Sequence, residues 1–277
     1  MSFVRVLLDS FRLLKMCPRF FIPKIVVSFL FFPIIVLVAI YFIKLNMFSP
    51  VDLSTRSPVE LTTTLMQLLF LLVYIILVYV IDSFMVNPMY PLLVEQYYKT
   101  QSINFRRAFI GVIQRFKVIF PSLIIFSIAL FVVIIPVTLI AALARFMENE
   151  LLFYLSLSAA VISIFAMLIL FYLIYPVSSL EKIDLVKVLK QTVLSSLKHK
   201  GDVTLAVLVS LAISTLSLVI AGAIVITNNT GQPLLTLLLF LLLVATRFLI
   251  AIFAAYQYVL NAVFYLGFEK GVFLGKK

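Results

Sequence analysis

The sequence predicts an all-α fold: a polytopic membrane helix bundle with six transmembrane helices in three pairs, each pair preceded by a cytoplasmic amphipathic helix. Hydrophobic residues make up 64% of the 277 residues, and they gather in long uninterrupted stretches. Only 12% of the residues are charged, whereas soluble domains have about 25% charged and about 45–50% apolar residues. This composition excludes a water-soluble monomer and a disordered chain.

Six apolar stretches are long enough to cross a hydrocarbon core about 30 Å thick, which takes about 20 helical residues. None shows the two-residue alternation of a membrane β-strand, so helices are favoured. The predicted spans are Ile25–Ile43, Leu61–Val94, Val118–Leu143, Leu151–Tyr175, Val203–Ile226 and Leu234–Phe268. The first begins only at residue 25 and no small-residue cleavage site follows it, so we expect no cleaved signal peptide.

Lys and Arg are distributed unequally between the two sides of these spans. The N-terminal segment, the segments after the second and fourth spans, and the C-terminal tail carry 18 of the 22. The predicted outer loops carry 3, and Arg247 lies inside a span. By the positive-inside rule, the protein is expected in the cell membrane with both termini cytoplasmic. The net charge of +11 therefore indicates topology, and no nucleic-acid partner is expected.

The three basic segments before the span pairs, Phe3–Met16, Asn104–Val118 and Asp184–Leu197, are predicted to be amphipathic helices. Their apolar stripes are Val4, Leu7, Leu8, Phe11 and Leu14; Phe105, Phe109, Val112 and Phe116; and Leu185, Val188, Leu189 and Val193. In the first segment Arg5, Asp9, Arg12 and Lys15 occupy another face. Such helices lie in the membrane interface with their cations toward anionic lipid headgroups. The alternative is that they are stiff connectors.

A unit of basic segment, span, outer loop and span recurs three times within the single membrane domain 1–277, over 1–94, 95–176 and 177–277. Residue matches at the ends of the second spans support a repeat. Asn87, Tyr90 and Glu95 match Asn261, Phe264 and Glu269, and Tyr90–Pro91 matches Tyr175–Pro176. The first helices of the pairs contain Pro33, Pro136 and Gly222, which either break these helices around a central site or are simply tolerated.

This order of a short amphipathic segment, a proline near the membrane entry and paired spans resembles a loose set of poorly characterised six-span membrane proteins of bacteria and archaea. The set includes the membrane domain joined to some glycerophosphodiester phosphodiesterases. The most similar stretch is Leu180–Thr192, just before the fifth span. The resemblance implies an all-helical membrane domain. It transfers no catalytic residue, because the soluble phosphodiesterase domain is not in the sequence.

Two ionisable residues, Asp82 and Arg247, lie deep in predicted spans, where charges are costly and often functional. Counting along straight helices places them about 14 Å apart along the membrane normal. We therefore expect Arg247 to extend toward the outer interface as an outer-leaflet charge rather than to pair with Asp82.

Four polar residues fall near Asp82 when the second and sixth spans are aligned by the repeat. The predicted intramembrane polar cluster is Asp82, Asn87, Tyr256, Gln257 and Asn261. Such a cluster either binds a polar headgroup or carries a proton, or it only holds the two spans together by hydrogen bonds.

The sequence predicts no enzyme. A single cysteine, Cys17, and a single histidine, His199, exclude an internal disulfide and any site of several Cys or His ligands. No P-loop, H-E-x-x-H or G-x-S-x-G motif is present, so no catalytic, cofactor or metal residues are expected. We expect transport or handling of a lipid or small solute. The alternative is a structural or assembly protein, a scaffold that binds a partner membrane protein.

The first testable prediction is the topology. A cysteine introduced at Thr55 or Asn229, next to the glycosylation sequon at Asn228, should react with a membrane-impermeant maleimide in intact cells, because both loops are expected outside. Labelling of either site only after permeabilisation would contradict the predicted orientation.

Overall fold

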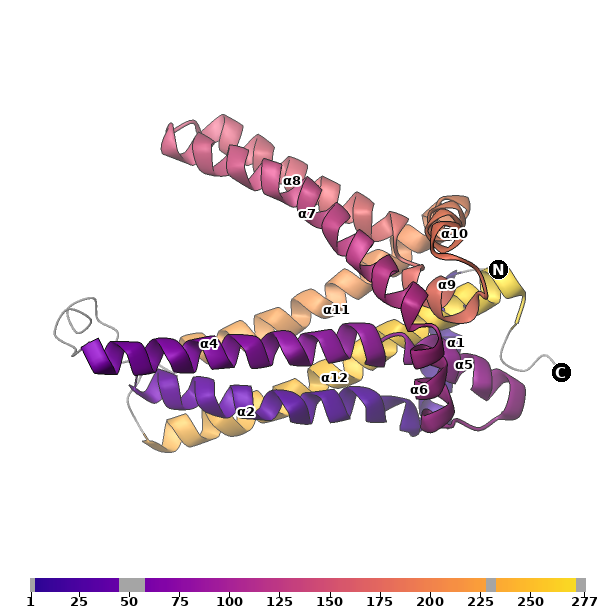
Figure 1. The fold of residues 1–277 in the computed structure, drawn as a ribbon, viewed down its shortest axis with the longest axis horizontal. Helices are drawn as coiled ribbons and strands as arrows, with labels where there is room; N and C mark the ends of the chain where they lie inside the picture. The colour runs from indigo at the N-terminus through magenta and orange to yellow at the C-terminus, as the bar shows by residue number, and fades with distance from the viewer. Residues whose placement is uncertain (1–2, 45–57, 228–232, 273–277) are drawn as a thin grey trace. The chain divides into compact units, whose positions relative to one another are not determined.

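The computed structural model describes residues 3–44, 58–227 and 233–272, and all regular secondary structure within these ranges is helical (Figure 1). Thr55, the Asn228 sequon and Asn229 lie outside the described residues. The chain forms two compact units, which we describe separately. Their boundaries differ from those of the three predicted repeat segments, so the repeat stays a prediction.

The first unit comprises residues 1–17, 87–211 and 257–277. Its helices are α1 (Phe3–Met16), α5 (Met89–Thr100), α6 (Phe105–Gln114), α7 (Phe116–Phe146), α8 (Glu150–Leu170), α9 (Ile174–Leu180), α10 (Leu185–Lys198), the start of α11 (Lys200–Thr227) and the end of α12 (Pro233–Lys270). Its core contains large, fully buried side chains from α5, α9 and α12, among them Tyr90, Leu93, Ile174, Leu260 and Phe264.

The second unit comprises residues 18–86 and 212–256. It contains the short helix η1 (Pro18–Phe21), α2 (Ile22–Lys44), α4 (Pro58–Ile81), the π-helix η3 (Asp82–Val86) and the remaining parts of α11 and α12. Each of the six predicted apolar stretches therefore lies in helical structure, although the second and fourth are interrupted.

Several helices are long and apolar enough to cross a membrane. Within the described residues these are Leu69–Thr100, Phe116–Phe146, Glu150–Leu180 and Val244–Lys270, and the bent pair Phe3–Met16 with Pro18–Pro33 would add a fifth. That pair bends by 99° at Cys17, so its two parts cannot form one straight span. The structure thus establishes an all-helical protein with several membrane-span candidates, while the number six stays a prediction.

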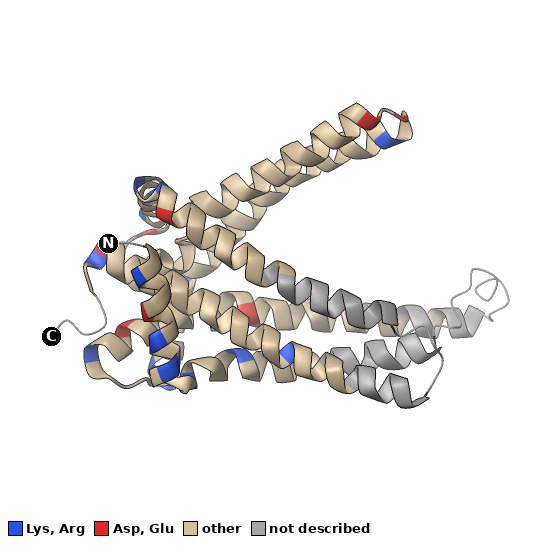
Figure 2. Ribbon diagram, turned by 180° about the vertical axis from the view of Figure 1, so that it is seen from behind, with Lys and Arg blue, Asp and Glu red and all other residues tan. Residues whose placement is uncertain are grey.

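The outward surface of the α7–α8 hairpin suits lipid better than water. The two helices pack against each other, and their outward residues are large and apolar, including Phe131, Val132, Leu155 and Ile162. Charged residues occur only at the two ends of the hairpin, as Figure 2 shows. An exposed apolar surface of this extent is unfavourable in water and suits hydrocarbon.

The helices interrupted in the structure are not those that contain Pro33, Pro136 or Gly222. α2, α7 and α11 continue through these residues, so they are tolerated within the helices. The interruptions occur instead at Asp82–Pro88, before α5, and at Phe171–Leu173, before α9. Proline follows closely in both cases.

Pro91 and Pro176 are each the third residue of the helix that begins after an interruption. Proline lacks an N–H and its ring collides with the carbonyl one turn earlier, so it is tolerated best in the first turn of a new helix. By the repeat matches, α12 has Tyr265 at this position, and α12 continues without a break to Lys270. The prolines therefore account for where these helices restart.

Helices occur in all three predicted amphipathic segments, and α1 packs a second face against the rest of its unit. Phe3, Val6, Ser10 and Leu13 are buried, together with Asp9 and Leu14. Most of the predicted stripe faces outward: Val4 is 63% exposed, Leu8 49% and Phe11 61%. Asp9 was predicted on one face with Arg5, Arg12 and Lys15, but Asp9 is buried whereas the three cations are exposed, because the chain covers only one side of α1.

Candidate functional site

In the second unit, an ion pair joins the first turn of α2 to the residue that follows α4. Lys24 Nζ donates hydrogen bonds to both carboxylate oxygens of Asp82, at 2.7 and 2.8 Å. Lys24 is 4% exposed, and the Asp82 side chain is 20% exposed. Asp82 was predicted as a site residue, whereas Lys24 was assigned to the cytoplasmic basic segment and missed.

The antiparallel packing of α2 and α4 brings these two residues together. Lys24 lies in the first turn of α2, and Asp82 follows the last residue of α4. Further along the hairpin, the Tyr74 hydroxyl donates to the Leu30 carbonyl at 2.8 Å. Both contacts fit one antiparallel register, which the sequence could have suggested, since Lys24 is the cation nearest the start of the first span.

Arg247, on α12, reaches α2 further along the same unit. Its guanidinium carbon lies 4.0 Å from the centre of the Phe31 ring, a cation–π contact, and the neighbouring Phe248 packs edge-on against Phe29 at 5.4 Å. Its Nε is buried and has no hydrogen-bond partner among the described residues. The predicted position of Arg247 at the outer interface stays a prediction.

Lys24, Asp82 and Arg247, three ionisable groups of this unit, influence one another. The charge of Asp82 attracts Arg247, and the charges of Arg247 and Lys24 repel each other. Because Lys24 occupies both oxygens of Asp82, Arg247 has no carboxylate of its own among the described residues. We call Lys24, Asp82 and Arg247 the charge cluster. It contains two cations and one anion.

The two predicted asparagines lie in the first unit, and both reach the interruption between α8 and α9. Asn87 Nδ2 donates to the Tyr175 hydroxyl at 3.5 Å, and Asn261 Nδ2 donates to the Tyr172 carbonyl at 2.6 Å. Tyr175 also packs edge-on against Tyr258 at 5.5 Å. These residues satisfy backbone and side-chain groups at the break, which is a structural role.

The remaining members of the predicted polar cluster are divided between the units. Gln257 Nε2, in the first unit, donates to the Ser210 carbonyl at 2.6 Å and so joins α12 to α11. Tyr256 and Asp82 belong to the second unit. The meeting of all five residues in one cluster therefore stays a prediction.

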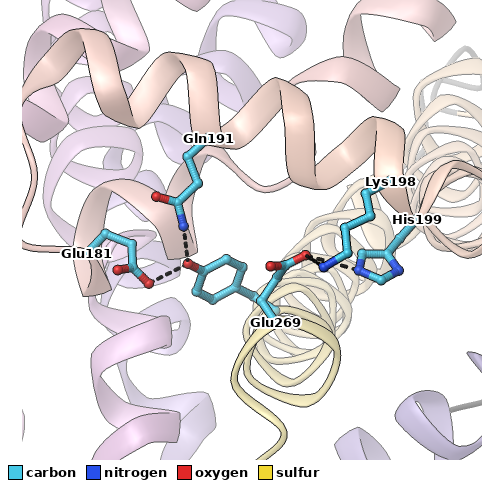
Figure 3. A network of polar contacts seen from close by, with 6 residues as sticks. Glu181, Gln191, Lys198, His199 and Glu269 are labelled. Carbon is cyan, nitrogen blue, oxygen red and sulfur yellow. Dashed lines mark hydrogen bonds and ion pairs between the residues drawn. The ribbon is translucent and has the colours of Figure 1, made fainter.

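A second polar network joins the end of α12 to the α9–α10 connection, and sequence reasoning missed it. Glu181 Oε1 accepts hydrogen bonds from the Tyr265 hydroxyl at 2.5 Å and from Lys270 Nζ at 2.6 Å. Gln191 Nε2 donates to the same tyrosine oxygen at 3.1 Å (Figure 3). These contacts hold the loop after α9 and the helix α10 against α12.

Glu269, one turn after Tyr265, binds the end of α10, just before α11 begins, in the same region. His199 Nε2 lies 3.0 Å from Glu269 Oε1, and Lys198 Nζ lies 3.4 Å from the same atom (Figure 3). The His199 ring also packs against Phe268 at 4.9 Å. His199 thus acts as a hydrogen-bond partner at the junction of α10, α11 and α12.

Several charges act on Glu181. Burial alone would raise the pKa of its carboxyl, but the hydrogen bonds from Lys270 and Tyr265 and the charges of Lys270 and Arg115 outweigh burial and lower the pKa below its ordinary value. Burial has the opposite effect on a cation and lowers the pKa of the Arg115 guanidinium. The negative charge of the nearby Glu181 partly offsets this decrease. Glu181 therefore contributes to stability in its ionised form.

Within the described ranges no group of three or more His, Cys, Asp or Glu side chains could hold a metal ion. No family model, curated protein or solved structure matches the chain. A functional assignment therefore depends on the geometry of the charge cluster and of the helices around it.

The charge cluster generates the second testable prediction. Asp82→Asn should lower the free energy of unfolding by about 3 kcal/mol or more, because it leaves the buried Lys24 ammonium unpaired. The double variant Lys24→Met with Asp82→Leu should stay within about 1 kcal/mol of wild type, because it removes both charges. Unfolding by denaturing detergent in mixed micelles would measure Asp82→Asn and the four proteins of a double-mutant cycle: wild type, Lys24→Met, Asp82→Leu and the double variant.

The exposed pair of Glu95 and Lys99, at 2.6 Å, is the matched control. The same double-mutant cycle on that pair should give a coupling of about 0.5 kcal/mol or less, because water screens it. A coupling for Lys24 and Asp82 as small as that of the control would show that their contact has no energetic weight.

The third prediction concerns Glu181. Glu181→Gln should lower the free energy of unfolding by about 1 kcal/mol near neutral pH, at the low end for hydrogen bonds to charged groups, since the carboxyl retains some exposure to water. Because the folded-state pKa is lowered, this stabilisation is present above the ordinary pKa of 4.5 and is lost as the pH falls through the folded-state value. Thermal unfolding in detergent from about pH 7 to about pH 3.5 would measure it.

The difference between wild type and Glu181→Gln should thus be constant near neutral pH and shrink in acid. Glu148→Gln, at the exposed tip of the α7–α8 hairpin, is the control and should show no difference at any pH. A difference for Glu181→Gln that grows in acid would contradict the assignment.

Proposed function

We propose that this chain is a non-catalytic integral membrane protein that transports or otherwise handles a lipid or small solute. The observation that carries the proposal is the Lys24–Asp82 ion pair, buried beside Arg247 in a unit whose helices are otherwise almost entirely apolar. Ionisable groups inside membrane helices are expensive, and they commonly line the path of a polar substrate.

A structural role alone gives a poor account of this cluster. Replacing a buried ion pair by well-packed apolar residues is often neutral or stabilising, so fastening α2 to α4 does not require charges. An unmatched cation such as Arg247 adds further cost in hydrocarbon and contributes little to packing beyond its contact with Phe31. Binding of a polar or charged group would account both for the buried ion pair and for the unmatched Arg247.

The membrane arrangement that we propose has six spans in three pairs, with both termini cytoplasmic. The exposed apolar stripe of α1 lies beside the exposed cations Arg5, Arg12 and Lys15. A helix of this kind places its apolar side in the acyl boundary and its cations against anionic headgroups. We extend this placement to α6 and α10, which also expose large apolar side chains such as Ile113 and Leu194.

A second candidate function is a scaffold for a partner membrane protein. The same exposed stripes favour it, because apolar helix faces on α1, α6 and α10 could cover a partner instead of lipid. The charge cluster has no evident purpose in that case, and for this reason handling of a lipid or solute is the preferred function.

The fourth prediction separates the two functions. Wild-type protein purified in mild detergent should retain one class of amphiphile or solute at a fixed ratio, identifiable by mass spectrometry. The variant Lys24→Met with Asp82→Leu should lose that compound, whereas Glu95→Gln with Lys99→Met should retain it. A wild type that retains only bulk lipid, together with a partner protein at fixed stoichiometry, would instead establish the scaffold.

A further inference from the structure

We infer that Arg247, with Lys24 and Asp82, forms a binding site for a phosphate group carried by a membrane amphiphile. This inference rests on the proposed function and names the chemical class of its ligand. It depends on three features of the charge cluster: its excess positive charge, the unpartnered Nε of Arg247, and the level along α2 at which Arg247 contacts Phe31.

The charge count leaves room for one anion. Lys24 and Arg247 are cations and Asp82 is the one carboxylate among them, so the cluster has a net charge of about +1 when all three are ionised. Because Lys24 Nζ holds both Asp82 oxygens at 2.7 and 2.8 Å, the carboxylate is already occupied. An anionic ligand would neutralise the remaining charge.

The chemistry of Arg247 specifies the kind of anion. The guanidinium is a planar fork of donors that binds phosphate through two parallel hydrogen bonds, which an ammonium cannot do. Phe31 lies against one face of the guanidinium, with the guanidinium carbon 4.0 Å from the ring centre, so the ring orients the group. The buried Nε has no partner among the described residues. In a bilayer, phosphate-bearing headgroups are the abundant source of such anions.

The position of Arg247 favours a ligand taken into the unit rather than one resting on its surface. Phe31 follows Lys24 by seven residues on α2, which corresponds to about 10 Å along the helix. The guanidinium thus lies about two turns beyond the Lys24–Asp82 pair. A phosphate that enters past Lys24 would meet a second cation at this level, with the Phe29 and Phe248 rings beside it.

The fifth prediction tests this site in the intact protein. In detergent with about 0.5 M salt, which screens the exposed cations, dioleoyl phosphatidylglycerol should raise the melting temperature and remain bound in native mass spectrometry. Dioleoylglycerol, which has the same chains without phosphate, should do neither. Arg247→Gln should weaken phosphatidylglycerol binding about tenfold or more, and Arg247→Lys should restore part of it, because it keeps the charge but not the fork.

Two control variants separate this site from other basic positions. Arg145→Gln removes an arginine that also contacts an aromatic ring, Phe153 at 5.8 Å, but that has no carboxylate pair beside it. Arg12→Gln removes an exposed cation of α1, whose attraction to anionic headgroups is screened at this salt concentration. Both should bind phosphatidylglycerol like the wild type.

Each outcome decides the inference. If inorganic phosphate protects as well as phosphatidylglycerol, the site takes a free anion, and the inferred lipid source is overturned while phosphate recognition stands. If dioleoylglycerol binds equally well, or Arg247→Gln binds unchanged, phosphate recognition is overturned and the proposed function survives. If Arg247→Gln does not fold, phosphate recognition is still tested by comparing the binding of phosphatidylglycerol and dioleoylglycerol to the wild type and to Arg247→Lys. Failure of the proposed function would be seen separately, if mass spectrometry found no compound that the wild-type protein retains at a fixed ratio.

Discussion

The buried ion pair between Lys24 and Asp82 is the constraint on which the second unit depends. An ammonium and a carboxylate placed among apolar helices must find each other, because no other partner offers comparable solvation. Their contact fixes the antiparallel register of α2 and α4, and the Tyr74–Leu30 hydrogen bond follows from that register. Once Lys24 has taken the carboxylate, Arg247 is left without one among the described residues, and the inferred anion site is based on this imbalance.

A different constraint shapes the first unit, and it acts on the backbone. Pro91 and Pro176 end one helix and begin the next, and the freed groups at these breaks must be satisfied inside the protein. Asn261 does this for the Tyr172 carbonyl. Where α12 has Tyr265 in place of proline, the helix continues, and the tyrosine hydroxyl instead binds Glu181 across to the α9–α10 connection. At the position of α12 that the predicted repeat aligns with these prolines, Tyr265 thus takes part in a side-chain network.

The sequence was sufficient to predict where the helices lie, but it was insufficient to predict which side chains contact one another. Apolar length and the spacing of charges located every long helix, because membrane-span length is a local property of the chain. Asp82 was singled out for the same reason. Its partner Lys24 was missed because it was counted as a topology signal, and the network around Glu181 was missed because its members are distant in sequence. On α1, the apolar pattern covers two faces, and only tertiary packing decides which one is buried.

The two networks differ in a way that favours the charge cluster over Glu181 as the proposed functional site. The Glu181 carboxylate binds Lys270 and Tyr265 and lies near Arg115, and Glu269 binds His199 and Lys198, so each acidic group there has cationic partners at the ends of helices. Such groups hold structure together, and the second cation near Glu181, Arg115, is half-buried and donates to the Ser179 carbonyl. The charge cluster differs in that the Nε of its second cation, Arg247, is buried without a partner among the described residues, and in that an aromatic ring orients the guanidinium. A site built to recognise an anion needs a donor of this kind, because a cluster whose donors are all occupied would have nothing to offer a ligand.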